Sequence, residues 1–168
     1  SYSAFVSPIK GKRKTTLGVN ITLHSTHGDL HKEMFMFGLG GGYSVRGWRI
    51  ETRELFKDEK QPYRFGFYSA VSSLELRQTV IPRFSIEQPT PFGPVKSSLG
   101  LQAVLFIDGG VAGDNWNDLT EMSPMFGVGL GVRIPVALAG SMRFDYGWSF
   151  YEGAVVESSF HLAVGQKF

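Results

Sequence analysis

Apolar and polar residues alternate one by one along most of this chain, which is the pattern of β-strands. In Ser141–Phe150 every even position is large and apolar, while the odd positions are small or charged and include Arg143 and Asp145. Thr16–Leu23 and Phe126–Ile134 repeat the pattern. Less regular strands are expected in four more segments: Tyr2–Ile9, Glu33–Gly40, Phe65–Val80 and Leu99–Val111. With the final segment, the chain is predicted to form about eight strands and no helix.

The final segment, Ser158–Phe168, separates its residues by size and polarity. Phe160, Leu162, Val164 and Phe168 share one face, while small or polar residues, Gly165 among them, form the other. In a soluble protein the apolar face would be buried. A C-terminal strand that ends on an aromatic residue, after several strands of the same pattern, is instead typical of an outer-membrane barrel. Residues 1–168 are therefore predicted to be one all-β domain, a transmembrane antiparallel β-barrel whose apolar face contacts lipid.

Composition agrees with a barrel and excludes other classes. The 168 residues suffice for one domain, and the content of 21 Gly and 14% aromatic residues suits tight turns and interfacial aromatic girdles. No run of 18 apolar residues exists, which excludes a transmembrane helix, and the absence of Cys excludes disulfides. The formal charge is only +2, and Lys and Arg are scattered, so nucleic acid is not an expected partner.

The connections between strands predict which segments face outside. Turn-forming residues occur at Gly11–Lys14, Ser25–Asp29, Gly113–Asp118 and Glu152–Ala154. Four prolines within Pro82–Pro94 predict a long connection there rather than a central strand. An even strand count puts both termini at the periplasmic side, so the connections near residues 11–14, 41–62, 113–123 and 152–156 are expected outside. The basic cluster Lys10, Lys12, Arg13 and Lys14 is either a contact for lipopolysaccharide phosphates or a charged turn that opposes misinsertion.

The longest connection, Gly41–Pro62, opens with a recognisable motif. Its residues are Gly41, Gly42, Tyr43, Ser44, Val45, Arg46, Gly47 and Trp48. With Gly40 before them, these residues form the run Gly-Gly-x-x-Ser-Val-Arg-Gly-aromatic, which resembles the signature of the BamA/TamA superfamily of outer-membrane assembly and translocation proteins. Further segments follow in the family's order: Ser72–Leu76, Phe106–Val111, Gly129–Arg133, Arg143–Phe150 and the terminal Phe168. The resemblance runs from about residue 38 to the end of the chain.

The resemblance implies that this loop folds back into the barrel and that Arg46 contacts acidic residues on the inner wall. Glu75 and Asp108 are the expected partners, because they lie on strands that should be neighbours. A guanidinium stripped of water needs such carboxylates, and its fork can bond two oxygens at once. The alternative is a solvated loop arginine. Small residues on the predicted inner faces, Gly127, Gly129, Gly131, Ala163 and Gly165, would leave space for the loop or relieve bending.

Strand number leaves the assembly open. The family's barrels have sixteen strands and this chain supplies about eight, so it could be half of a sixteen-strand barrel or a small closed barrel with the loop outside. The missing half would come from a longer chain, from a second copy or from another protein. A half-barrel completed by a second chain or copy is favoured, because loop, acidic partners and glycine-rich face are all present. An unpaired strand edge in lipid is not viable.

Other chemistry is weakly supported. His24, His27 and His31 near Asp29 and Glu33 match no metal-binding spacing, the Gly38–Gly42 run lacks the Gly-Lys-Ser/Thr of a phosphate loop, and Ser44 is in no nucleophile elbow. We expect no enzyme activity, cofactor or metal. The resemblance implies protein insertion or translocation in a bacterial or organellar outer membrane, with unfolded proteins as clients. In this family the first and last strands are thought to meet at a weak seam with which client strands can pair, and the terminal strand would be one edge of that seam. The alternatives are a passive structural or adhesive barrel and a diffusion channel.

Overall fold

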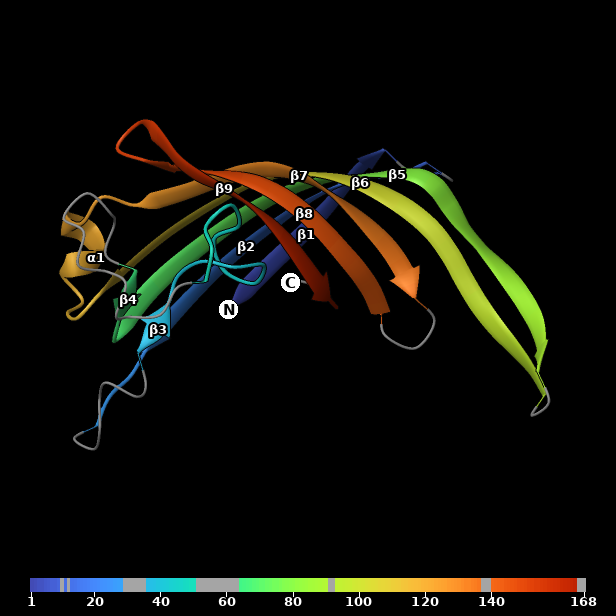
Figure 1. The fold of residues 1–168 in the computed structure, drawn as a ribbon, viewed down its shortest axis with the longest axis horizontal. Helices are drawn as coiled ribbons and strands as arrows, with labels where there is room; N and C mark the ends of the chain where they lie inside the picture. The colour runs from blue at the N-terminus through green and yellow to red at the C-terminus, as the bar shows by residue number, and fades with distance from the viewer. Residues whose placement is uncertain are drawn as a thin grey trace.

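Seven antiparallel strands form the main sheet of a computed structural model that describes residues 1–9, 11, 13–28, 36–50, 64–90, 93–136 and 140–165. The spatial order is β1-β2-β5-β6-β7-β8-β9, so strands adjacent in the sheet follow one another along the chain. The sheet is an arch, and β1 and β9 are its two edges (Figure 1). The strands are β1 (Tyr2–Ile9), β2 (Thr15–Ser25), β5 (Tyr68–Thr90), β6 (Gly93–Gly113), β7 (Met125–Val136), β8 (Gly140–Tyr151) and β9 (Ala154–Val164). The all-β antiparallel class predicted from the alternation is confirmed.

Three short elements accompany the sheet. β3 (Phe37–Gly38) pairs with β4 (Phe65–Gly66), and α1 (Asp118–Glu121) is a single helical turn between β6 and β7. The expected strand Glu33–Gly40 is wrong for the part that is described, because only Phe37–Gly38 is extended and it pairs outside the main sheet. Glu33 and its two successors lie outside the described residues. Among the residues that are described, no helix is long and apolar enough to cross a membrane.

The two faces of the sheet have the polarity expected for lipid rather than water. The concave face buries Ser73, Glu75 and Asp108, whereas Leu130 and Leu162 on the other face are 50% and 60% exposed. A water-soluble sheet would bury its apolar face. Inward polar and outward apolar residues on successive positions are the pattern of a transmembrane barrel wall. The exposed outer face includes Leu74, Leu76, Leu105, Ile107, Phe126, Val128, Tyr146, Trp148 and Phe160.

The long connection predicted at Pro82–Pro94 is wrong, because β5 and β6 continue through it as a paired ribbon. Their register runs to Pro89↔Pro94 and Thr90↔Gly93, after shifts between Thr79, Ile81 and Phe84. β2 stops pairing with β5 at Gln78, and β7 stops pairing with β6 at Gln102. Beyond those points each ribbon strand has one edge that pairs with no other described strand, and proline on such an edge removes no ladder bond. Figure 1 shows this two-stranded ribbon projecting past the other strands.

The strand directions contradict the prediction of which connections lie at the same end of the sheet. The β2–β5, β6–β7 and β8–β9 connections lie at one end, and the β1–β2, β5–β6 and β7–β8 connections lie at the other. The turn near residues 11–14 is therefore opposite the motif-bearing connection, not beside it. The prediction failed because Glu33–Gly40 was counted as a full strand, which reversed every direction before it. With seven strands, the sheet's first and last residues, Tyr2 and Val164, also lie at opposite ends, contrary to the even-count prediction.

Candidate functional site: a loop held against the concave face

The motif residues form a loop, Gly40–Arg49, that lies against the concave face of the sheet; we call it the inserted loop (Figure 1, teal). Val45 and Trp48 are fully buried and pack with Leu39 from the segment that precedes the loop. The sheet contributes three residues to this cluster, namely Val71, Ala112 and Met125. The Trp48 indole N–H also donates to the Phe126 carbonyl at 2.8 Å. A bulky apolar pair on either side of Arg46 therefore fixes the loop in place.

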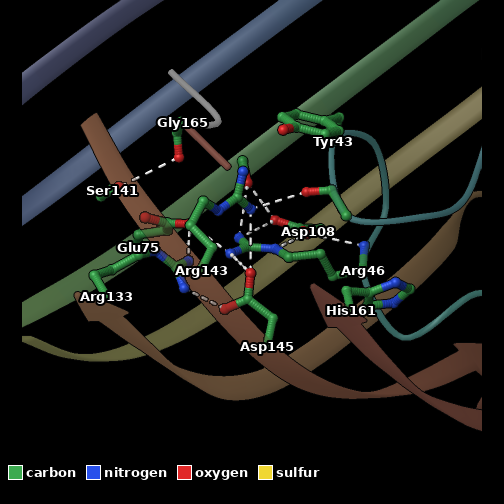
Figure 2. Close-up of polar contacts among 12 residues, drawn as sticks. Tyr43, Arg46, Glu75, Asp108, Arg133, Ser141, Arg143, Asp145, His161 and Gly165 are labelled. Carbon is green, nitrogen blue, oxygen red and sulfur yellow. Dashed lines mark hydrogen bonds and ion pairs between the residues drawn. The ribbon is translucent and has the colours of Figure 1, made fainter. Parts of the chain in front are cut away.

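Arg46 is the centre of the polar contacts. Its Nε and Nη2 donate to the two carboxylate oxygens of Asp108 at 2.7 and 2.8 Å, and its Nη1 donates to Glu75 at 2.5 Å. The backbone N–H of Arg46 donates to the same Asp108 at 3.0 Å. All three side chains are fully buried. Figure 2 shows the guanidinium between these two carboxylates, which come from the neighbouring strands β5 and β6.

A second layer of charges surrounds this centre. Arg77 and Arg133 contact Glu75 at 2.7 and 3.3 Å, and Arg133 also contacts Asp145 at 2.5 Å. Arg143 contacts Asp145 at 3.1 Å (Figure 2). Four arginines and three carboxylates therefore share one network on the concave face. Because burying an isolated charge is costly, such a network tolerates burial only while its members stay paired.

Electrostatics keep Arg46 charged despite its burial. Burial alone would lower the pKa of the Arg46 guanidinium, but the hydrogen bond and charge of Asp108, helped by two further carboxylates, raise this pKa above its ordinary value. The guanidinium also lies over the Phe106 ring, with its central carbon 3.7 Å from the ring centroid. A lysine has neither the planar fork nor the stacking surface for these contacts.

Glycines on the sheet give the inserted loop its close approach. A Cβ on Gly127 would fall on the Arg46 carbonyl oxygen, and a Cβ on Gly147 would lie 2.8 Å from the Gly47 nitrogen. Gly47 itself has φ +96°, which favours glycine, and a Cβ there would meet the Trp148 backbone at 2.9 Å. Gly129 and Gly131 face Phe106 and Asp145 instead of the loop. Only part of the predicted glycine-rich face therefore contacts the loop directly.

The inserted loop also follows the edge strand β9. The Gly47 N–H donates to His161 Nε2 at 3.0 Å, and the Arg49 N–H donates to the Glu157 carboxylate at 3.0 Å. Glu157 in addition lies 3.5 Å from Arg64, the buried arginine that stacks over Trp48. The end of the inserted loop, at Arg49, and the start of β4's segment, at Arg64, therefore both contact β9 through Glu157.

The other predicted residues lie as follows. Gly41 has φ +80°, Gly42 lies beside His161, and Ser44 is half-exposed. On β9, Phe160, Leu162 and Val164 are exposed on the outer face, while Gly165 follows the strand with φ +96°. Phe168 lies outside the described residues.

The histidine-rich segment that could form a metal site lies only partly within the described residues. His24 stacks on Phe37 and shares a 3.1 Å hydrogen bond with Ser69, and the His27 ring meets the Tyr68 ring edge-on. Asp29, His31 and Glu33 lie outside the described residues. The described residues contain no cluster of three or more His, Asp or Glu that could hold a metal ion.

Sequence reasoning missed several members of the site: Arg64, Arg77, Arg133, Glu157 and His161. Arg133 occupies an inward position of a strand that was recognised, so the parity of the alternation could have identified it. Glu157 was missed because the predicted strand begins only at Ser158, whereas β9 begins at Ala154. No local signal points to Arg64.

Comparison with known proteins gives one match. The family model described as the Omp85 superfamily domain matches residues 3–168. The match includes β1 and β2, which precede the segment where the motif resemblance begins. Neither the comparison with curated proteins nor that with solved structures gave a match.

Proposed function

Because this chain belongs to the Omp85 superfamily of outer-membrane assembly and translocation proteins, we propose that it inserts or translocates client proteins through the inserted loop and the edge strand β9. The family places the chain in a bacterial or organellar outer membrane. The observation that carries the proposal is the position of β9. It is an edge of the described sheet, and the loop that carries the family motif contacts it at Gly47 and Arg49.

An edge strand provides a physical mechanism for insertion. Backbone N–H and C=O groups on an open edge cannot be satisfied by lipid, so they favour pairing with another strand. An unfolded client that contributes an extended segment satisfies those groups, and its pairing templates the next strand. No bond is made or broken, and no cofactor takes part. The clients are accordingly unfolded outer-membrane or secreted proteins.

We propose further that the described sheet is a half-barrel within the single domain of residues 1–168, completed by a second copy, another chain or the rest of a longer one. Both β1 and β9 are edges of the described sheet, and the exposed apolar face requires lipid on its outer side. The outer-membrane lipid is thus a partner. Lipopolysaccharide contact by the basic turn near residues 11–14 is not part of this proposal. That turn lies at the same end of the sheet as the β5–β6 and β7–β8 connections. Short connections are typical of the periplasmic end of such barrels.

The test reconstitutes the chain in phospholipid vesicles and measures the folding rate of a denatured client barrel. The proposal expects faster folding than in empty vesicles, and slower folding with Arg46→Ala than with the control Arg49→Ala. Folding at the empty-vesicle rate excludes the insertase. Ion conductance without acceleration favours the diffusion channel, and neither effect favours a passive barrel. The mass of the detergent-solubilised particle decides the assembly, because a stable particle of one chain contradicts completion by a second copy or another chain.

A further inference from the structure

The free edge of β9 can be assigned residue by residue from its pairing with β8. The Gly165 N–H donates to the Ser141 carbonyl at 2.7 Å, and Val164 lies opposite Met142 in the register. In an antiparallel pair, hydrogen-bonded and non-hydrogen-bonded positions alternate. Since Gly165 bonds to β8, the backbone groups of Val164, Leu162 and Phe160 point to the other side, which is the open edge.

One of these edge groups already has a partner from the inserted loop. The Tyr43 hydroxyl donates to the Val164 carbonyl oxygen at 2.6 Å. Tyr43 is the exposed aromatic residue of the motif, and this bond joins it to the end of β9 that is remote from the β8–β9 turn. No comparable contact to Leu162 or Phe160 occurs among the described residues. Within the described part of the chain, the open edge is therefore occupied at Val164 and available at Leu162 and Phe160.

The position of Tyr43 is fixed by its neighbours. Arg143 donates to the Gly42 carbonyl at 2.9 Å, and the Arg143 guanidinium faces the Tyr43 ring at 5.4 Å from its centroid (Figure 2). A Cβ on Gly42 would lie 3.4 Å from His161 Cβ, so the loop backbone lies directly on β9. Three residues later, Arg46 is held by two buried carboxylates. The phenol is thus held over the strand edge rather than swinging freely.

We infer that Tyr43 is a register stop for the seam: it limits strand pairing on the open edge of β9 to the part of the strand before Val164. This inference rests on the proposed use of β9 as a pairing edge and adds its regulation. The partner is an extended segment with alternating apolar residues. Its N–H opposite Val164 would have to replace the Tyr43 hydroxyl as the donor to the Val164 carbonyl oxygen. A client strand consequently pairs at Phe160 and Leu162 first and extends further only when the inserted loop moves.

The chain contains no cysteine, which allows a direct crosslinking test. Single cysteines at Phe160 and at Val164 have side chains on the same face, and both positions direct their backbone groups to the open edge. The chain is placed in phosphatidylcholine vesicles with a synthetic strand peptide of alternating valine and threonine that carries one central cysteine. We expect the disulfide yield at position 160 to exceed that at position 164 about fivefold, the ratio that one ordinary hydrogen bond supports. Tyr43→Phe should remove the difference.

The control is Tyr146→Phe, which removes another exposed phenol, bonded to Ser158 Oγ on the outer face, and should leave the ratio unchanged. Equal yields at both positions with Tyr43 present, or an unchanged ratio with Tyr43→Phe, overturn the register stop alone. No disulfide at either position in any variant overturns edge pairing itself, and the register stop with it. Should Tyr43→Phe fail to fold, hydrogen exchange on the unmodified chain decides. Added peptide must protect the amides of Phe160 and Leu162 but not that of Val164, and protection that includes Val164 contradicts the inference.

Discussion

Replacing Arg46 by alanine should destabilise the protein far more than removing the exposed arginine of the same loop, Arg49. The substitution removes two side-chain bonds to Asp108 and one to Glu75, all between fully buried groups. Removing one partner of a buried ion pair costs about 3–5 kcal/mol. Glu75 keeps Arg77 and Arg133, so its share of the loss is reduced. The expected loss is therefore near the lower end, about 3 kcal/mol.

The assay is equilibrium unfolding by urea in phospholipid vesicles, followed by tryptophan fluorescence, since Trp48 is fully buried beside Arg46. The matched control is Arg49→Ala in the same loop, because that side chain is 68% exposed and its ion pair with Glu157 spans 3.7 Å. An exposed pair of this kind contributes less than about 1 kcal/mol. Arg46→Lys should lie between the two, because lysine keeps the charge but not the fork. Equal losses for Arg46→Ala and Arg49→Ala would refute the buried-network account.

Three further changes test separate parts of the site. Gly127→Ala should displace the inserted loop, because its Cβ would fall on a loop carbonyl; the urea midpoint should drop well below that of Gly109→Ala, whose Cβ meets only side-chain atoms at 3.2 Å or more. Glu157→Gln weakens the contacts to Arg49 and Arg64, so trypsin should cut after Arg49 faster than in the unmodified chain, and an unchanged rate argues against a role of Glu157 in holding the loop. Replacing residues 85–98 by an Asn-Gly turn should leave the midpoint unchanged, since the described residues of this part of the β5–β6 ribbon pair only with each other.

Local alternation was sufficient to predict most of the sheet. β1 matches its predicted range, and β2, β7 and β8 match theirs within two residues, because every second position of these strands is apolar. The proline rule failed at the β5–β6 ribbon because it assumes a neighbour on both sides, which only the pairing pattern reveals. The strand predicted at Glu33–Gly40 failed for a related reason. Its residues suit an extended backbone, but sequence does not specify which partner an extended segment pairs with.

The candidate site, like the sheet, could be predicted only in part. The motif around Arg46 and its resemblance to a family indicated Glu75 and Asp108, and the structure places both within 2.7 Å of the guanidinium. The contacts of the inserted loop with β9 could not be predicted, because they join residues more than 100 positions apart through loop backbone atoms. Alternation shows that His161 faces inward but not what it meets. Long-range contacts of single polar atoms leave no periodic signal in the sequence.

The central claim is that the apolar face of the sheet contacts lipid and the face with the inserted loop does not. The chain's three tryptophans allow a direct measurement, because Trp148 is partly exposed on the outer face and Trp48 is buried against the concave face. Variants that retain only one of these residues are reconstituted with phospholipids brominated in the acyl chains. The account predicts strong quenching of Trp148 and little quenching of Trp48. Quenching of Trp48 with Trp148 unaffected would contradict it.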